Sequence, residues 1–148
     1  MELRVLNETD ADLLSSLQLQ DDVWEFIGNL PETGPEHTNH LFAIMEGQAS
    51  LGFTGLRRSQ AAGGDDFELL CATRAEVQHH GVAKQACQLV LEWAFTTGKL
   101  ARVIACIDNE NEAARAIAGK IGMVPLGPSG PSRTVYVKYS DERGRTGA

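Results

Sequence analysis

The feature that most constrains the fold of this chain is a strand–helix–strand unit that spans residues 67–107. Residues 67–73 and 101–107 are short apolar runs, and between them lies a long helix-forming stretch whose polar side chains follow one stripe. Strands that are joined by a helical crossover run parallel in one sheet, and the connection is right-handed. The sequence therefore predicts a sheet that contains a parallel pair, with a helix packed on it.

A polar turn that contains Gly81 lies between the first strand of this unit and its helix. The segment Gln78-His79-His80-Gly81-Val82-Ala83 fits the pattern Q/R-x-x-G-x-G/A, in which glycine lets the backbone approach a ligand. The start of a helix has unpaired N–H groups and partial positive charge, so it suits a phosphate. Successive N–H groups from His79 to Lys84 are therefore predicted to surround a pyrophosphate.

The rest of the chain predicts antiparallel strands and further helices. Alternating or apolar runs bounded by turn residues predict strands at 3–6, 40–45, 48–57, 67–73, 101–107, 123–126 and 132–139. Amphipathic runs predict helices at 11–17, 21–27, 82–97 and from about 109 to 121, the last capped by Asn109 or Asn111. The predicted fold class is α/β, with a mixed, mostly antiparallel twisted sheet of six to seven strands flanked by about four helices.

Length and charge narrow the classes of function. The 148 residues fit one domain, predicted at 1–140, followed by a flexible tail at 141–148. A net charge of −7 argues against a protein that binds nucleic acid by neutralising phosphates. No apolar run approaches the roughly 20 residues of a membrane span, and no signal-peptide pattern opens the sequence. We therefore expect neither a nucleic-acid nor a membrane partner.

The cysteine and histidine residues indicate neither disulfides nor a metal site. Cys71, Cys87 and Cys106 all lie within apolar runs, and an odd number of buried thiols is typical of a reduced, cytoplasmic protein. The spacing of His37 and His40 can bind metal on a helix, but it falls in a loop without a nearby third ligand. We expect core cysteines and no metal.

A second segment lies downstream of the Gly81 turn and follows a strand. It reads Asn111-x-x-Ala114 and ends in Lys120-Ile121-Gly122-Met123. Together the two segments resemble the acetyl-CoA-binding motifs of the GCN5-related N-acetyltransferase (GNAT) superfamily, and the resemblance covers the chain to about Tyr139. The N-terminal pattern L-R-V-L-N-E-T-D-A-D-L, followed by D-D-V-W-E-F-I, is similar to the branch that includes the ribosomal-protein N-terminal acetyltransferases.

The resemblance implies an acetyl-CoA site and a reaction. Backbone groups of Cys71, Ala72 and Thr73 would hold the pantetheine arm. Asn111 would contact CoA, and the pyrophosphate would lie against the turn formed by Gln78, His79, His80, Gly81, Val82, Ala83 and Lys84. The implied partners are acetyl-CoA as cosubstrate and an amine acceptor, a protein N-terminus or a small molecule. The amine would attack the thioester directly in a ternary complex, and a strand N–H would meet the oxyanion.

Glu68 is the candidate general base, because the family often places an acidic residue on this strand. The alternative is a glutamate that merely faces solvent. Two positions depart from the family pattern: Ala118 replaces a tyrosine that protonates the leaving thiolate in many members, and Met123 replaces an aromatic residue. These departures leave open a rival function, a catalytically weak or inactive CoA-binding sensor or interaction module. A domain without any CoA site is the third alternative. The sequence leaves the oligomeric state open, a homodimer included.

Overall fold

The computed structural model describes residues 1–6, 10, 40–77 and 80–140 of the chain. Within them, one seven-stranded sheet carries two α-helices, and a 3-10 turn lies at Ala75–Val77. The strands are β1 (Glu2–Val5), β2 (His40–Glu46), β3 (Ala49–Ser59), β4 (Asp66–Thr73), β5 (Arg102–Asp108), β6 (Val124–Ser129) and β7 (Arg133–Tyr139), and the helices are α3 (Val82–Thr96) and α4 (Glu112–Lys120). The helices predicted at 11–17 and 21–27 and the tail at 141–148 lie outside the described residues.

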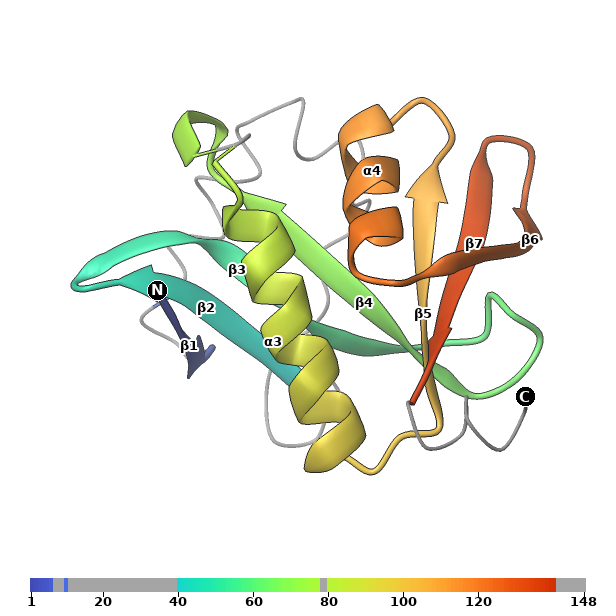
Figure 1. Ribbon diagram of the computed structural model, residues 1–148, viewed down its shortest axis with the longest axis horizontal. Coiled ribbons are helices and arrows are strands. Elements are labelled where there is room, and N and C mark those ends of the chain that lie inside the picture. The colour runs from blue at the N-terminus through green and yellow to red at the C-terminus, as the bar shows by residue number, and fades with distance from the viewer. Residues whose placement is uncertain (7–9, 11–39, 78–79, 141–148) are drawn as a thin grey trace.

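The sheet has the order β1-β2-β3-β4-β5-β7-β6 and is antiparallel at every pairing except one. The exception is β4 with β5, the two strands that helix α3 connects. This confirms the predicted mixed, mostly antiparallel sheet and the parallel pair. Figure 1 shows α3 lying across β4 and α4 lying beside β5.

The last hairpin differs from the prediction. Residues 127–129 were expected in a turn, but they form the second half of β6, and the turn follows at Gly130, whose φ is +72°. The strand tolerates Pro125 and Pro128 because β6 is the last strand of the sheet, so one side of its backbone needs no partner there. A register shift between Pro125 and Gly127 accommodates the irregularity.

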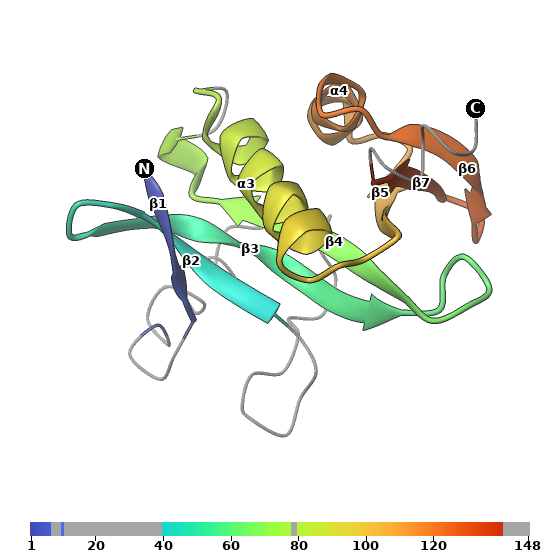
Figure 2. The same cartoon turned by 60° about the horizontal axis from the view of Figure 1, so that its bottom comes forward.

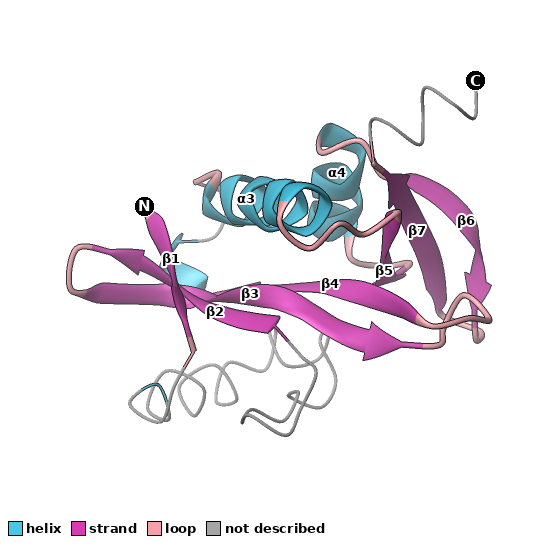
Figure 3. Ribbon diagram, turned by 90° about the horizontal axis from the view of Figure 1, so that it is seen from below, coloured by secondary structure: helices cyan, strands magenta, loops and turns pink. Residues whose placement is uncertain are grey.

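Both helices lie on one face of the sheet, and β5, β7 and β6 turn away from β1–β4 (Figures 2 and 3). The largest hydrophobic cluster joins α3 to the strands beneath it, with Cys87, Val90 and Leu91 of the helix against Leu56 and Leu69 of the sheet. The apolar Leu89 of α3 is exposed, because the helix contacts the sheet along one side only.

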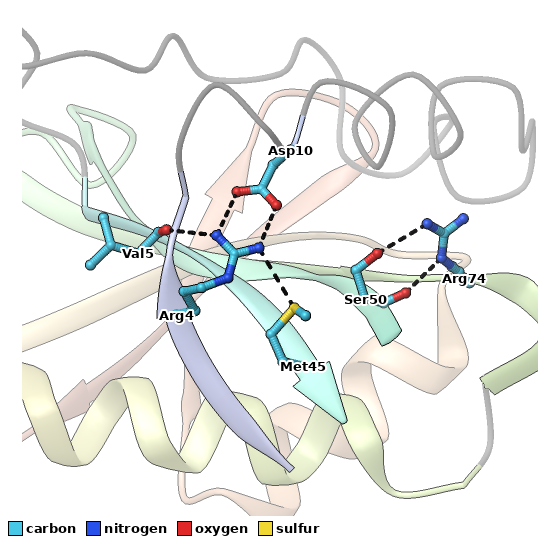
Figure 4. A network of polar contacts seen from close by, with 6 residues as sticks. All are labelled: Arg4, Val5, Asp10, Met45, Ser50 and Arg74. Atoms are coloured by element: carbon cyan, nitrogen blue, oxygen red, sulfur yellow. Dashed lines mark hydrogen bonds and ion pairs between the residues drawn. The ribbon is translucent and has the colours of Figure 1, made fainter. Parts of the chain in front are cut away.

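Hydrogen bonds and an ion pair tie the first strands to neighbouring segments, as Figure 4 shows. Both terminal nitrogens of Arg4 donate to the buried carboxylate of Asp10, at 3.1 and 2.7 Å. Arg74, just past β4, donates to the carbonyl and the hydroxyl oxygen of Ser50 on β3. These bonds fix the ends of β1 and β4. Among the residues that the structure describes, no helix is long and apolar enough to cross a membrane.

Candidate active site

The parallel strands β4 and β5 meet at one residue pair and then separate. Glu68 and Ile104 form their only pairing in the described sheet, although β4 continues to Thr73 and β5 to Asp108. Backbone groups of β4 beyond Glu68 are therefore not used in pairing with β5. Where a strand has no neighbour on one side, backbone groups on that side can hydrogen-bond an extended ligand, which is the role predicted for residues 71–73.

An ion pair closes the narrow end of this separation. Nε and an Nη atom of Arg102 donate to the two carboxylate oxygens of Asp66, at 2.8 and 2.9 Å. The hydrogen bond to Asp66 is the largest cause that raises the pKa of the Arg102 guanidinium. A two-point contact between arginine and a carboxylate constrains both position and orientation. The first residues of β4 and β5 are thus held together while the later residues diverge.

A cleft of about 610 Å³ occupies the space between the diverging strands and is also lined by both helices. It is lined on the β4 side by Glu68 to Thr73, on the β5 side by Ala105 to Asp108, and at α4 by Asn111 and the alanine-rich face of the helix. Gly81, Ala83 and Lys84 line its end at the start of α3. The cleft therefore joins the strand edge to a helix N-terminus.

The start of α3 offers backbone N–H groups to this cleft. Gly81 is the N-cap residue with φ of +79°, a left-handed conformation that glycine adopts without strain, and no side chain among the described residues caps the helix. The first helical hydrogen bond runs from the Gln85 N–H to the Gly81 carbonyl, at 3.1 Å. The N–H groups of residues 82–84 precede this bond, so they point out of the helix start and suit an anion.

The charges that line the cleft also favour an anionic ligand. Three cationic side chains, Lys84, Lys120 and Arg133, face two acidic ones, Glu68 and Asp108. The cleft is thus locally positive, although the chain has a net charge of −7. Lys84 lies in the first turn of α3, so its ammonium group adds to the positive field at the helix start. This composition fits the phosphates of a CoA molecule.

Most of the predicted cofactor residues come together in the cleft. Its lining includes these members of the predicted set: Cys71, Ala72, Thr73, Gly81, Ala83, Lys84 and Asn111. His80 and Val82 are not among the lining residues, and His80 is exposed, so both lie beside the cleft instead of in it. Gln78 and His79 fall outside the described residues. Asn111, and not Asn109, is the N-cap of α4, and its side-chain oxygen accepts the Ala114 N–H at 3.0 Å.

Glu68 lies at the point where the strands separate, and it is buried. Its exposed fraction is 4%, so the reading of Glu68 as a solvent-facing residue is wrong. An Nη atom of Arg57 contacts its Oε2 at 3.2 Å from the directly opposite position on β3. Alternate residues of a strand face opposite sides. Since Leu69 packs toward α3 and Leu70 belongs to the cluster on the other face, Glu68 shares the face of Leu70.

Cys106 of β5 also lines the cleft. Burial raises the pKa of its thiol most, and the charge of Glu68 and a hydrogen bond to it raise it further, from 9.0 to about 11. Cys106 and Cys71 are half-buried, whereas Cys87 is buried, so only Cys87 is fully a core residue as predicted. The two half-buried thiols differ from the prediction because the separation of β4 and β5 opens their strands to the cleft.

Several cleft residues were not predicted from the sequence. Arg57, Asp108, Lys120 and Arg133 line the cleft or pair with its acid, but none of them was a predicted site residue. Asp108 and Lys120 flank or belong to the second motif, whereas Arg57 and Arg133 lie outside both motifs. The sequence does contain a signal that could have identified Arg57. An arginine and a glutamate on adjacent predicted strands are candidates for cross-strand pairing. No group of three metal-ligating side chains occurs within the described ranges.

The fold and the site together define an enzyme class that binds a CoA thioester. Its features are a mixed sheet that opens between two parallel strands, and a helix start and cationic side chains along the opening. A family model, the acetyltransferase (GNAT) domain, matches residues 1–124, and the chain belongs to this family. GNAT domains are acetyl-CoA-dependent N-acetyltransferases. The predicted family, enzyme class and cosubstrate are therefore confirmed. No curated protein matches the sequence.

Solved structures with this fold include enzymes of named activity. Spermidine N-acetyltransferase from Vibrio cholerae, solved with CoA and spermine, has a TM-score of 0.78 and 16% identity, with 96% of each chain covered. Ribosomal-protein-S5-alanine acetyltransferase from Vibrio fischeri has a TM-score of 0.72 and 13% identity, over 95% of this chain and 93% of that one. A GNAT-family acetyltransferase from Bacillus anthracis has a TM-score of 0.74 and 20% identity, with 93% of each chain covered. At these identities the likeness supports the fold alone.

Proposed function

We propose that this protein transfers the acetyl group of acetyl-CoA to a primary amine by direct attack of the amine on the thioester. The observation that carries the proposal is the single pairing of Glu68 with Ile104, after which β4 and β5 diverge around the cleft. This arrangement brings a carboxylate and the edge of β4 that β5 does not pair to the same end of a cleft whose other end is a helix start. A nucleophile, its base and the thioester can then meet in one place.

Different residues of the cleft would bind different parts of acetyl-CoA. The helix start at Gly81, with Lys84 beside it, would hold the pyrophosphate, and the backbone of Cys71, Ala72 and Thr73 would hold the pantetheine arm. A β4 backbone N–H beyond Glu68 would donate to the thioester oxygen as negative charge develops there. Asn111 would act chiefly by fixing the start of α4 along the cleft, because its side-chain oxygen already caps the helix.

Glu68 would be the general base. A primary amine is mostly protonated at neutral pH, so it must lose a proton before it can attack. Arg57 holds one oxygen of the Glu68 carboxylate, which orients the group and offsets the cost of burying its charge. Because Glu68 lies on the face of β4 opposite α3, the acceptor amine would approach from that face.

The proton for the leaving thiolate would come from water. Ala118 is 2% exposed and lines the cleft, and the described lining contains no tyrosine. A thiol has an ordinary pKa of about 8.5, so CoA can leave as a thiolate at moderate cost and be protonated afterwards. The proposal therefore does not require a dedicated acid.

The acceptor is a protein N-terminus or a small amine, and a panel would identify it. Spermidine, spermine and peptides that begin with alanine represent the activities of the structural neighbours. Release of free CoA thiol would be measured for each amine against a blank without amine. Amine-dependent thiol release that is lost in Glu68→Gln would support the proposal. Binding of acetyl-CoA without turnover of any amine would favour the CoA-binding sensor module.

We also propose that residues 1–140 form one acetyltransferase-like domain, with 141–148 as its tail. Cytoplasmic location fits the three free cysteines. A homodimer is compatible with the exposed Val124 and Leu126 on the terminal strand β6. Sedimentation equilibrium would measure the mass in solution, and a monomer at micromolar concentration would contradict the dimer.

A further inference from the structure

The hydroxyl group of Thr54 is a polar group inside the buried part of the sheet. Thr54 lies on β3, is fully buried, and is directly opposite Cys71 of β4. Its Oγ donates a hydrogen bond to the main-chain carbonyl of Leu70 at 2.8 Å. A buried hydroxyl costs free energy unless it is hydrogen-bonded, and valine has nearly the same shape without that requirement. The side chain of Thr54 therefore depends on β4, and it acts on one particular peptide group of that strand.

The Leu70 carbonyl points from β4 toward β3, and two observations give this direction. Thr54 is on β3, so its hydroxyl reaches only a carbonyl on that side of β4. In addition, the N–H of Arg74 donates to the Leu51 carbonyl, which makes these two residues a hydrogen-bonded pair of the antiparallel ladder. Such pairs alternate along a ladder, and the register between β3 and β4 is continuous, so Gly55 and Leu70 form another such pair.

The same peptide group presents the Cys71 N–H to the cleft. No peptide bond among the described residues is cis, and in a trans peptide the carbonyl of one residue and the N–H of the next point in opposite directions. Since the Leu70 carbonyl points toward β3, the Cys71 N–H points toward the β5 side. The described β4 pairs with β5 only at Glu68 and Ile104, and beyond this pair the cleft that Cys71 lines occupies the β5 side. The Cys71 N–H is therefore a donor for a molecule in the cleft.

We propose that Thr54 is a positioning residue for acetyl transfer, and that it acts through the Leu70–Cys71 peptide group to hold the Cys71 N–H toward the thioester oxygen. This inference rests on the proposed function of the cleft, and it assigns the strand N–H that meets the developing oxyanion. Thr54 is not among the described residues that line the cleft, so its effect on the reaction is indirect.

The place of Cys71 along β4 suits this role. Alternate residues of a strand direct their N–H groups to the same side, so the N–H groups of Leu69 and Cys71 both face the β5 side. Leu69 directly follows the residue pair that joins β4 to β5, so its N–H lies within that pairing. Cys71 then provides the first N–H beyond this pairing that faces the cleft. The candidate base Glu68 and the oxyanion donor thus lie on one rigid strand.

The Thr54 bond has two effects on the Cys71 N–H. It fixes the plane of the peptide group, so the donor need not reorient as the thioester carbon becomes tetrahedral. It also polarises the peptide group, because a carbonyl that accepts a hydrogen bond strengthens the N–H of the same group as a donor. Both effects stabilise the negatively charged oxygen of the transition state more than the neutral oxygen of bound acetyl-CoA. Loss of the hydroxyl should therefore lower kcat and leave the affinity for CoA unchanged.

The kinetic test uses Thr54→Val, which keeps the shape of the side chain, and Thr54→Ser, which keeps the hydroxyl. Thr54→Val should lower kcat for the best amine about three- to tenfold, which is less than the roughly 100-fold cost of losing an oxyanion donor, because the Cys71 N–H remains. The dissociation constant for CoA, measured by calorimetry, should not change, and Thr54→Ser should recover most of the lost rate. Thr96→Val is the matched control, because the Thr96 hydroxyl also donates to a main-chain carbonyl, that of Glu92 at 2.6 Å, away from the cleft.

The amide resonance of Cys71 gives a second readout, which needs no turnover. In isotopically labelled wild-type protein, acetyl-CoA should shift the Cys71 amide proton more than CoA does, since only acetyl-CoA carries the thioester oxygen. This difference should shrink in Thr54→Val and return in Thr54→Ser. A Cys71 amide that responds identically to both ligands in the wild type would overturn the proposal, even if Thr54→Val failed to fold.

The two measurements separate this proposal from the proposed function. An unchanged kcat in Thr54→Val, or a loss of kcat and CoA affinity together that serine does not restore, would overturn the positioning role while wild-type turnover still supports acetyl transfer. Wild-type protein that releases no thiol with any amine would contradict acetyl transfer. In that case the resonance decides, because a difference between acetyl-CoA and CoA at Cys71 that depends on the Thr54 hydroxyl would retain the positioning of this N–H.

Discussion

Glu68 of β4 and Ile104 of β5 are paired in parallel register, and beyond this pair the two strands separate. The separation places a buried carboxylate at the apex of the cleft, where the pairing of β4 with β5 ends. In a fully paired parallel sheet, the same residues would be enclosed by ladder hydrogen bonds. Each of the predictions below tests a residue that builds or uses this opening.

Glu68→Gln should lower kcat/KM for the best amine by about 100-fold or more at neutral pH, because a positioned base contributes on that order. The loss should shrink as pH rises, since more of the amine is then already unprotonated. A pH–rate profile of both proteins is the measurement. Equal activity of the variant and wild type across the whole pH range would show that Glu68 is not the base.

Arg57→Gln should reduce kcat by about tenfold and also lower stability, because the buried Glu68 carboxylate loses the guanidinium at 3.2 Å. Arg58→Gln is the matched control, because Arg58 is adjacent in sequence but lies over the Phe67 ring at 5.7 Å. The pH dependence of kcat should change in Arg57→Gln only. If both variants behaved alike, Arg57 would have no specific role in positioning Glu68.

Gly81→Ala should weaken CoA binding by more than its loss of stability explains. An alanine at φ of +79° costs about 1–2 kcal/mol, and its methyl group would enter the space at the start of α3. Gly63→Ala is the control, because Gly63 has φ of +89°, equally open surroundings and a place in the β3–β4 turn away from the cleft. Urea unfolding and calorimetry with CoA would be compared. Similar CoA affinities for the two variants would argue against a phosphate at Gly81.

Asp66→Asn should destabilise the protein by about 1–3 kcal/mol, because the carboxylate that receives both Arg102 bonds is lost at the closed end of the cleft. The KM for acetyl-CoA should rise as the apex loosens. Asp65→Asn, at the exposed neighbouring position, is the control and should change neither quantity. Urea unfolding and initial rates provide the measurements. An unchanged KM in Asp66→Asn would show that the ion pair does not determine the shape of the cleft.

Cys106 should titrate at about pH 11 in the folded protein, above its ordinary 9.0. A folded-state pKa that is raised in this way contributes stability fully below pH 9.0, and this stability is lost as pH rises toward 11. In the Cys71→Ala/Cys87→Ala double variant Cys106 is the only cysteine, so the pH dependence of its alkylation rate would report its ionisation. Adding Glu68→Gln should lower its pKa, because the Glu68 charge and hydrogen bond are removed. An unchanged midpoint would show that burial alone causes the shift.

The sequence alone was sufficient for the elements whose signals are local. Gly81 before a helical pattern and the apolar run at 67–73 each depend on a few adjacent residues, and the structure has the predicted elements there. The family motifs then indicated the cosubstrate and eight of the residues that line the cleft, Glu68 included. Local patterns failed at the last hairpin, where tertiary pairing with β7 extends β6 through Gly127 and Pro128.

Only the tertiary structure decided how these pieces act together. The separation of β4 from β5 and the burial of Glu68 against Arg57 both join residues that are distant in sequence. Alternation along a strand predicts which of its residues share a face of the sheet. Sheet order and twist determine which other side chains lie on that face. For this reason the sequence alone determined which segments are predicted to bind acetyl-CoA. The packing of strands and helices determined which other side chains surround the cleft between those segments.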